Sequence, residues 1–321
     1  MTSYTSIGAY KIAMMVRSAK TILVEGETDA SLLNRLILER ALGSSHAGAK
    51  PVVDRVDLIK DQILSGMGNR QRVLKIAEAV GGSRDKFRGF VDKEWHGYDF
   101  VTEEVNNFLE CDEALNSVML TKGHSIENYF FDHSYYREFI LRNFGDRLPH
   151  AYFEEIPKTV DSGLLAAFVL SAGARKAELI ERCSGLISKD MLESTNAGFS
   201  MNIDLVIRAL KARQVSDEKC EILRSECERV APRALGAASY ALIARWAVHG
   251  HIGDAVIWAA LAKLATVHGL PAKEADQIEC GQRREKFLDG AQFLARREEN
   301  DRVPIDRLLS WAQGRQPSFE A

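Results

Sequence analysis

The residues ahead of about position 135 alternate between two hydrophobic periods, and this alternation is the strongest constraint on the fold. Short β-rich apolar runs are separated by stretches with helical apolar spacing. The pattern predicts strands at 21–25, 55–61, 88–92 and 117–121, and helices at 29–43, 70–80 and 102–110. Because strands and helices in this order need right-handed crossovers, we predict an α/β fold with a Rossmann-like, mostly parallel sheet.

The chain after about residue 135 loses these strand signals. Segments rich in Ala and Leu predict helices at 164–187, 204–212, 219–230, 237–248 and 255–267. We therefore predict two domains, an α/β domain over residues 1–147 and a mostly helical domain over residues 148–321. The stretches at 235–248 and 255–267 are apolar on most sides, which fits either a core or a surface for dimerisation or partner docking.

The composition excludes several classes of protein. With 321 residues, 46% of them hydrophobic, the chain can bury a sizeable core. A net charge of −3 gives no global basic field for nucleic acid, so any such binding must use local patches. The five cysteines are scattered without a CxxC pair, which indicates neither a disulfide framework nor a cysteine zinc site. Because no signal-peptide core or membrane-length apolar run occurs, we expect a cytoplasmic protein without a membrane anchor.

Polar side chains follow three of the predicted strands, at the point where each strand ends. They are Glu25 and Asp29 after the first strand, Asp92 and Glu94 after the third, and Ser125 and Glu127 after the fourth. Ligands of parallel α/β sheets gather at the carboxyl ends of the strands, so we expect these side chains to lie together. Five carboxylates at one edge suit two divalent ions, Mg²⁺ or Mn²⁺, that clamp the attacking and leaving oxygens of a phosphodiester.

Each of these groups also has a simpler explanation when it is taken alone. Asp29 lies where an acid caps a helix and meets its dipole. Asp92 and Glu94 fit a solvated loop, and Ser125 with Glu127 fits an ordinary helix cap. The prediction of a metal site therefore depends on the three groups occurring together at one edge of one sheet.

Three stretches carry a resemblance to a known family: VEGETD at 24–29, VDKEWHGYD at 91–99 and GHSIENY at 123–129. Together they resemble a Toprim domain. This fold is shared by topoisomerases, bacterial primases, recombination proteins and overcoming-lysogenization-defect (OLD) nucleases. The motif positions of the OLD-like branch match Glu25, Asp29, Asp92, Glu94, Ser125 and Glu127. The ordered set looks most like the DUF4435 family, which includes the AriB-type effector nucleases of PARIS anti-phage systems. The resemblance covers residues 20–135 and extends only vaguely into the helical remainder.

This resemblance implies roles for the motif residues. Glu25, Asp92 and Glu94 would bind Mg²⁺ or Mn²⁺ directly, Asp29 and Glu127 would hold a second ion or orient its waters, and Ser125 would support the site through hydrogen bonds. In one departure from the family pattern, Glu94 replaces the second aspartate of D-x-D. In another, the downstream lysine of OLD-like sites has no clear match, and Lys158, Lys176 and Lys189 all remain open.

The implied activity is that of a toxic endonuclease in abortive infection, cleaving RNA such as tRNA, or DNA. Its implied partners are the nucleic acid substrate and a controlling ABC-type ATPase (AriA-like), and the helical region would serve homodimerisation or docking. Two other functions stay open, a primase-like nucleotidyltransferase and a catalytically inactive Toprim module that binds nucleic acid.

The loop SGMGNRQR at 65–72 is a further candidate. Its backbone N–H groups, the helix N-terminus and the side chains of Arg70 and Arg72 fit a phosphate contact, although a tight turn before a helix explains the same residues. The chain has no P-loop pattern, so we do not expect it to hydrolyse ATP by itself. His96 and His124 flank the later motifs as candidate general acids or ligands, or as ordinary loop histidines.

Overall fold

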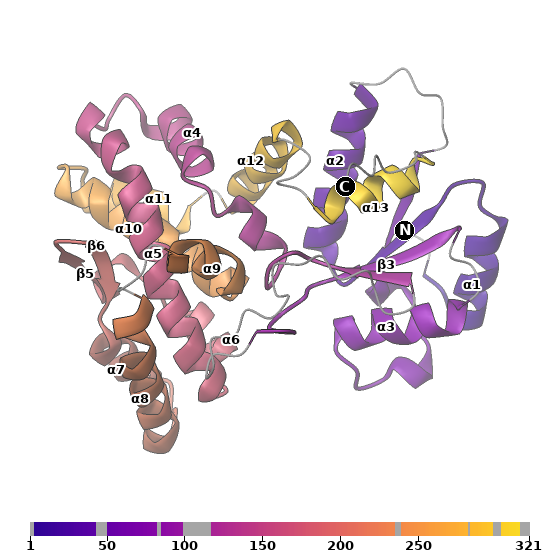
Figure 1. Cartoon of the computed structure of the whole chain (residues 1–321), viewed down its shortest axis with the longest axis horizontal. Helices are drawn as coiled ribbons and strands as arrows, with labels where there is room; N and C mark the ends of the chain where they lie inside the picture. Colours follow the sequence, from indigo (N-terminus) through magenta and orange to yellow (C-terminus); the bar gives the residue numbers. More distant parts are fainter. Residues whose placement is uncertain are drawn as a thin grey trace. The chain divides into compact units, whose positions relative to one another are not determined.

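The computed structural model of the chain (Figure 1) describes residues 3–42, 50–81, 85–98, 117–234, 239–281, 283–297 and 303–314. These residues belong to two compact units. The first, here called the sheet unit, contains residues 3–42, 50–81, 85–96, 117–126, 290–297 and 303–314. The second, the helical unit, contains residues 97–98, 127–234, 239–281 and 283–289. The predicted boundary between residues 147 and 148 concerns folding domains and stays a prediction.

A four-stranded, fully parallel sheet forms the centre of the sheet unit. Its strands are β1 (Thr21–Val24), β2 (Val52–Arg55), β3 (Phe87–Val91) and β4 (Val118–Leu120), in the order β2-β1-β3-β4. Thr21 pairs with Val52 on one side and with Phe87 on the other. All four residues of β1 are buried, as expected for a central parallel strand covered on both faces. The predicted α/β fold with a parallel sheet is therefore confirmed.

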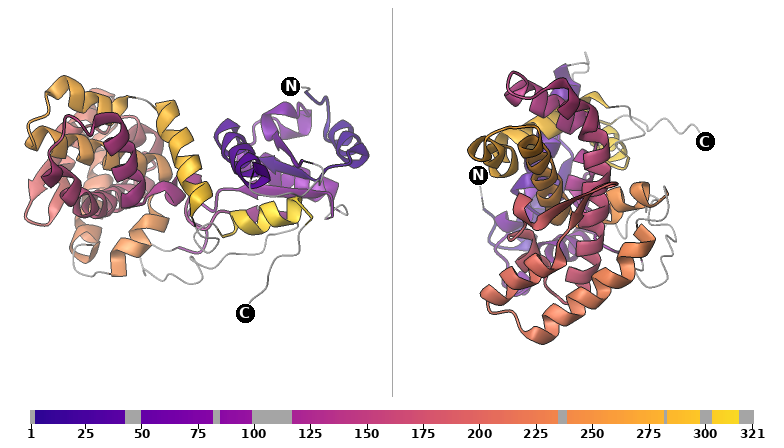
Figure 2. Two further views of the ribbon diagram at one scale, coloured as in Figure 1. Left: turned by 90° about the horizontal axis from the view of Figure 1, so that it is seen from above. Right: turned by 90° about the vertical axis from the view of Figure 1, so that its left-hand side faces the viewer.

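Helices cover this sheet, and one of them comes from late in the chain. The helices are α1 (Ile7–Val16), α2 (Glu27–Leu42), α3 (Asn69–Val80) and α13 (Ile305–Ala312). The α13 helix is amphipathic, and Ile305, Leu308 and Leu309 are buried. Figure 2 shows the yellow helix α13 beside the sheet. The Nζ of Lys20, just before β1, donates a 2.7 Å hydrogen bond to the carbonyl of Trp311, and Arg40 of α2 forms an ion pair with Asp306. Residues 305–312 thus complete the unit that the first strands begin.

The second strand lies earlier than the sequence predicts. We expect it at 55–61, but β2 spans Val52–Arg55, and 3₁₀ turns follow at Val56–Leu58 and Gln62–Leu64. Two adjacent apolar runs compete here, and the pairing with β1 selects the first one. The second run instead buries Val56 and Ile59 in the core beneath the sheet. The predicted helix at 102–110 lies outside the described residues.

The helical unit is organised around one long helix, α5 (His150–Lys176), against which α8 (Asp217–Ala234) and α10 (Gly250–Val267) pack. The other helices are α4 (His133–Phe144), α6 (Ile180–Ser184), α7 (Ile203–Ala212), α9 (Ser239–Ala247), α11 (Ala272–Cys280) and α12 (Arg283–Arg296), whose last residues belong to the sheet unit. The predicted mostly helical character is confirmed. The helix expected at 164–187 begins earlier, at His150 directly after Pro149, and it also ends earlier, at Lys176. A short antiparallel hairpin, β5 (Leu192–Thr195) with β6 (Gly198–Met201), was not predicted.

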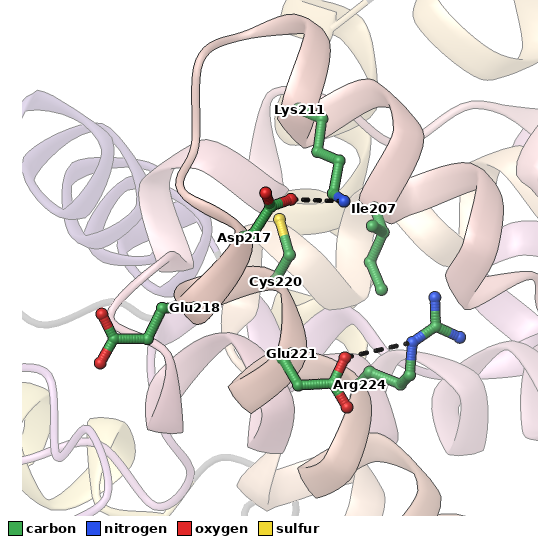
Figure 3. Close-up of a pocket in the computed structure, with 7 residues that line it drawn as sticks. All are labelled: Ile207, Lys211, Asp217, Glu218, Cys220, Glu221 and Arg224. Atoms are coloured by element: carbon green, nitrogen blue, oxygen red, sulfur yellow. Dashed lines mark ion pairs between the residues drawn. The ribbon is translucent and has the colours of Figure 1, made fainter.

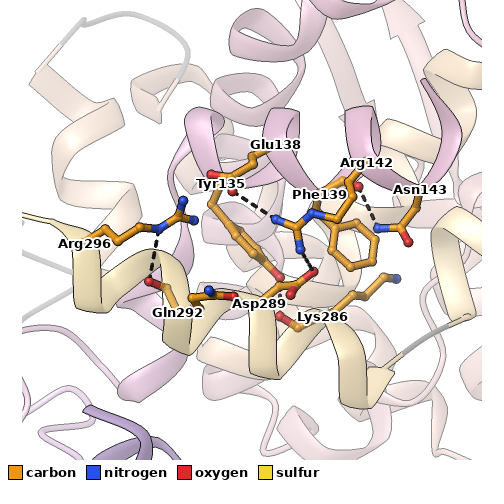
Figure 4. Close-up of polar contacts among 9 residues, drawn as sticks. All are labelled: Tyr135, Glu138, Phe139, Arg142, Asn143, Lys286, Asp289, Gln292 and Arg296. Carbon is orange, nitrogen blue, oxygen red and sulfur yellow. Dashed lines mark hydrogen bonds and ion pairs between the residues drawn. The ribbon is translucent and has the colours of Figure 1, made fainter. Parts of the chain in front are cut away.

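Polar contacts fasten α12 to α4 (Figure 4) and also to α11, inside the helical unit. The guanidinium of Arg142 contacts Asp289 at 2.8 Å, and the hydroxyl of Tyr135 donates to the carbonyl of Lys286 at 2.6 Å. The buried Nζ of Lys286 donates to the carbonyl of Ile278 at 2.6 Å and lies 3.9 Å from the ring centre of Trp258. Lys286 therefore satisfies the last carbonyls of α11, where a cation also meets the helix dipole favourably. In the described part of the chain, no helix has the length and apolar character to span a bilayer.

Candidate active site at the carboxyl edge of the sheet

The strand order places a topological switch point at the carboxyl ends of β1 and β3. The chain leaves β1 for β2 on one side of it and later adds β3 on the other side. Such a topological switch point is where parallel α/β sheets bind ligands, because the loops after the two strands diverge there. Glu25 directly follows β1, and Asp92 directly follows β3. Two of the predicted site residues therefore lie at the switch point.

Glu25 ties the two strand ends together. The main-chain N–H of Asp92 donates a 2.9 Å hydrogen bond to Oε1 of Glu25. Burial raises the pKa of Glu25, and the charge of Glu94 raises it further. The hydrogen bond from Asp92 and the positive charge of Arg70 act in the opposite direction. The hydrogen bond thus fixes the half-buried carboxylate of Glu25, and the charges of Glu94 and Arg70 both act on its pKa.

The loops after β3 and β4 are joined by hydrogen bonds from main-chain N–H groups. The N–H of Glu94 donates to the carbonyl of His124 at 2.7 Å, and the N–H of Lys93 donates to Oγ1 of Thr121 at 2.8 Å. Glu94 has a φ of 55°, a left-handed conformation that is uncommon for a non-glycine residue. The ring of His124 packs edge-on against Trp95, with 4.3 Å between their centres. These contacts set the position of the Glu94 backbone, while its side chain stays about half exposed.

Asp29 has a structural task in the turn after β1. Its Oδ2 accepts a 3.0 Å hydrogen bond from the N–H of Gly26, in the first turn of α2. Glu27, beside it, is an exposed side chain whose Oε2 lies 3.0 Å from Arg55. The capping explanation for Asp29 is therefore supported, and the role as a ligand of a second ion stays a prediction.

Ser125 and Glu127 fall in different units. Ser125 is buried in the sheet unit. Glu127 belongs to the helical unit, where its Oε1 lies 3.4 Å from Nδ1 of His251 in the first turn of α10. Sequence analysis gave His251 no connection with Glu127, because the two residues are 124 positions apart and share no motif.

The arrangement fits an open metal site better than a closed cage. Among the residues that the structure describes, no three His, Cys, Asp or Glu side chains lie close enough to hold a metal ion by themselves. Mg²⁺ commonly takes only one or two carboxylates and completes its shell with water and substrate phosphates. Glu25 and Glu94 interact electrostatically, and the loop of Asp92 joins them, so this group offers hard oxygen ligands of that kind.

Arg70 is a cation that lies beside these acids. Its Nη1 lies 3.6 Å from Oε2 of Glu94, and it begins the first turn of α3. From the sequence, Arg70 fits either a phosphate contact of the glycine-containing loop or a tight turn before a helix, and neither alternative links it to the acids. Of the lysines left open, Lys158 donates to the carbonyl of Asn196, and Lys189 forms ion pairs with Asp276 and Glu279, all within the helical unit.

A pocket of about 420 Å³ lies elsewhere, between α7 and α8 of the helical unit (Figure 3). Its charged side chains contact one another: Lys211 lies 2.5 Å from Asp217, and Arg224 lies 3.9 Å from Glu221. Cys220 at its base is buried, and burial raises the pKa of the thiol. Four of the five charged side chains that line the pocket are already paired with one another, so the pocket shows no cluster of charges that would select a ligand.

Comparison of the sequence with protein-family models and with curated proteins finds no match. The fold and the site themselves place the protein in one structural class, that of parallel α/β sheets with acidic residues at the switch point. The likeness to Toprim and DUF4435 proteins rests on the motif residues alone.

Proposed function

We propose that this protein is a metal-dependent, Toprim-type endonuclease that hydrolyses phosphodiester bonds of nucleic acid, either RNA such as tRNA or DNA. The observation that supports it most strongly is the hydrogen bond between Glu25 and the N–H of Asp92 across the switch point. With Glu94 on the same loop as Asp92, three acids of the motif follow the two strands that meet at the switch point. The parallel sheet and the ordered motif fit the same proposal.

The residues of the chain divide the work as follows. Glu25, Asp92 and Glu94 would hold the divalent ion, with Asp29 and Glu127 as further ligands or water-orienting groups. A bound Mg²⁺ or Mn²⁺ lowers the pKa of a coordinated water and neutralises charge developing on the phosphate. Glu25 is positioned in advance by the Asp92 N–H, and Glu94 by its main-chain bond to His124. Such fixed ligands cost little reorganisation during the reaction.

The biological setting belongs to the same proposal. We propose a cytoplasmic toxic effector of anti-phage defence that a partner ABC-type ATPase (AriA-like) holds inactive, with the helical unit providing homodimer or docking contacts. The support for this is the motif resemblance, together with the largely apolar helix α10.

The direct test compares the protein with two variants, Glu25→Gln and Glu27→Gln. The control, Glu27, lies two residues further on, and its side chain is 83% exposed. Purified proteins are incubated with labelled RNA and DNA in Mg²⁺, Mn²⁺ or EDTA, and induced cells are checked for toxicity and for fragmented RNA or DNA, with and without the partner ATPase. We expect cleavage that requires the metal, that Glu27→Gln retains, and that falls at least about 100-fold in Glu25→Gln, a loss of about 3 kcal/mol in transition-state stabilisation.

The outcomes separate the candidate functions. Cleavage or toxicity that Glu25→Gln retains in full would contradict the proposed catalytic site. Product formation that requires nucleoside triphosphates would assign a primase-like nucleotidyltransferase. Metal-independent binding of nucleic acid, without cleavage under any condition, would assign an inactive Toprim module.

A further inference from the structure

Arg70 reaches the acidic site from a neighbouring loop and helix. The chain turns after β2 through Gly66, which has a φ of 75°, and α3 begins at Asn69 after Gly68. A left-handed turn of this kind favours glycine, because other residues meet steric strain there. Arg70 thus occupies the first helical turn, and its guanidinium lies 3.6 Å from the carboxylate of Glu94.

The contact between Arg70 and Glu94 is a loose one. At 3.6 Å the two groups attract each other electrostatically but do not make a hydrogen bond of ordinary length. The side chain of Arg70 is 30% exposed and that of Glu94 is 53% exposed, so solvent screens the pair. The buried Nε of Arg70 has no hydrogen-bond partner in the described part of the chain. The guanidinium therefore neutralises the carboxylate without being locked to it.

The same position would be contested by a divalent ion. An ion bound to Glu94 carries twice the charge of the guanidinium and gains closer contact with the oxygen atoms. A guanidinium displaced from Glu94 retains a planar set of donors that matches the oxygens of a phosphate. The Nε donor that is buried without a partner, together with the two terminal nitrogens, would then be available for such a contact.

We propose that Arg70 is an internal counter-cation of this centre, which competes with a divalent ion for Glu94 and turns to the substrate phosphate once the ion is bound. This inference rests on the proposed nuclease function, because it needs both an ion and a phosphodiester at the site. It gives Arg70 a direct contact with the substrate phosphate, and it supplies a cation at the site without the unmatched downstream lysine.

The test measures the binding of Mn²⁺ alone, by calorimetry and without nucleic acid, to the full chain and to the variants Arg70→Gln and Arg72→Gln. Arg72 is a suitable control because it lies two residues further along α3, about 200° around the helix from Arg70. Removing the competing cation should tighten Mn²⁺ binding to Arg70→Gln by about fivefold, whereas Arg72→Gln should bind as the unchanged protein does. Thermal unfolding of each variant checks that the fold is intact.

A second measurement follows nucleic acid binding in Ca²⁺, an ion chosen to support binding without cleavage. Arg70→Gln should bind the nucleic acid about tenfold more weakly, and Arg70→Lys should recover part of the loss because it restores the charge but not the planar donors. If Arg70→Gln binds Mn²⁺ no more tightly than the unchanged protein, the competition is wrong and the nuclease proposal is untouched. If the unchanged protein binds no Mn²⁺ at all, both proposals fall.

Discussion

Two glycines of the same helix make a sharp test of how the helical unit packs. Gly173 lies where α5 meets α8, and a Cβ atom added there would be 2.5 Å from Sγ of Cys227 and 2.9 Å from the carbonyl oxygen of Leu223. Gly163, ten residues earlier, faces α10, where an added Cβ would meet Ala260 and Ile257 only at an ordinary 3.6 Å. The two helix pairs therefore approach each other at different distances.

The expected effects of Gly→Ala differ in sign. In a helix interior the change normally stabilises by about 1 kcal/mol, because alanine has the higher helix propensity. Gly163→Ala should show most of that gain, since its space is open. At Gly173 the new methyl overlaps a neighbouring backbone, and overpacking costs about 1–3 kcal/mol. The net expectation for Gly173→Ala is a loss of up to about 2 kcal/mol.

The assay is urea unfolding followed by circular dichroism, with tryptophan fluorescence to separate the transitions of the two units. Trp246 and Trp258 belong to the helical unit, and Trp95 and Trp311 to the sheet unit. A stability of Gly173→Ala equal to or above that of the unchanged protein would refute the close approach of α5 and α8. Adding Cys227→Ala should restore part of the loss, with a coupling energy above about 0.5 kcal/mol, because it removes the sulfur but leaves the carbonyl.

Two further predictions concern buried charges. Burial, and then the charge of His251, lowers the pKa of His249 to about 4. The unfolded chain therefore takes up the proton first, and the free energy of unfolding should fall by up to about 2 kcal/mol between pH 7.5 and pH 5. Urea titrations should show this loss reduced in His249→Gln, and an unchanged slope would contradict it. Asp306→Ala should destabilise the sheet unit by about 2–3 kcal/mol, because it leaves Arg40 buried without its ion-pair partner. Thermal unfolding measures this loss. A loss in stability as small as that from breaking an exposed ion pair would show that the contact is weak.

The sequence predicted the sheet and its acidic edge for a physical reason. A short apolar run that ends in acidic residues indicates a buried strand followed by a polar loop. Glu25 and Asp92 could therefore be placed at strand ends. Parallel order then followed from the intervening helices. The position of β2 could not be predicted, since the run VDLI at 56–59 is at least as apolar as VVDR at 52–55, and pairing with β1 selects the latter.

Other features depend on contacts that no local pattern carries. The hairpin of β5 and β6 escaped prediction because three of the four side chains in β5 are exposed and no buried alternation marks it. Arg70 beside Glu94 is a pairing of residues from two separate loops, so the sequence offered only a choice between phosphate contact and tight turn. The ion pair of Arg40 with Asp306 joins residues more than 260 positions apart.

The place of α13 in the sheet unit has a consequence for synthesis. The ribosome makes β4 long before residues 305–312, and roughly 10–40 s separate the two at ordinary elongation rates. During that interval the surface that later covers Ile305 and Leu308 is open to solvent, and the ion pair between Arg40 and Asp306 cannot form. The unit that carries Glu25 and Asp92 therefore reaches its final stability only after the helical unit has been translated. In a chain truncated before residue 305, Glu25 and Asp92 would lie in a sheet unit that lacks α13.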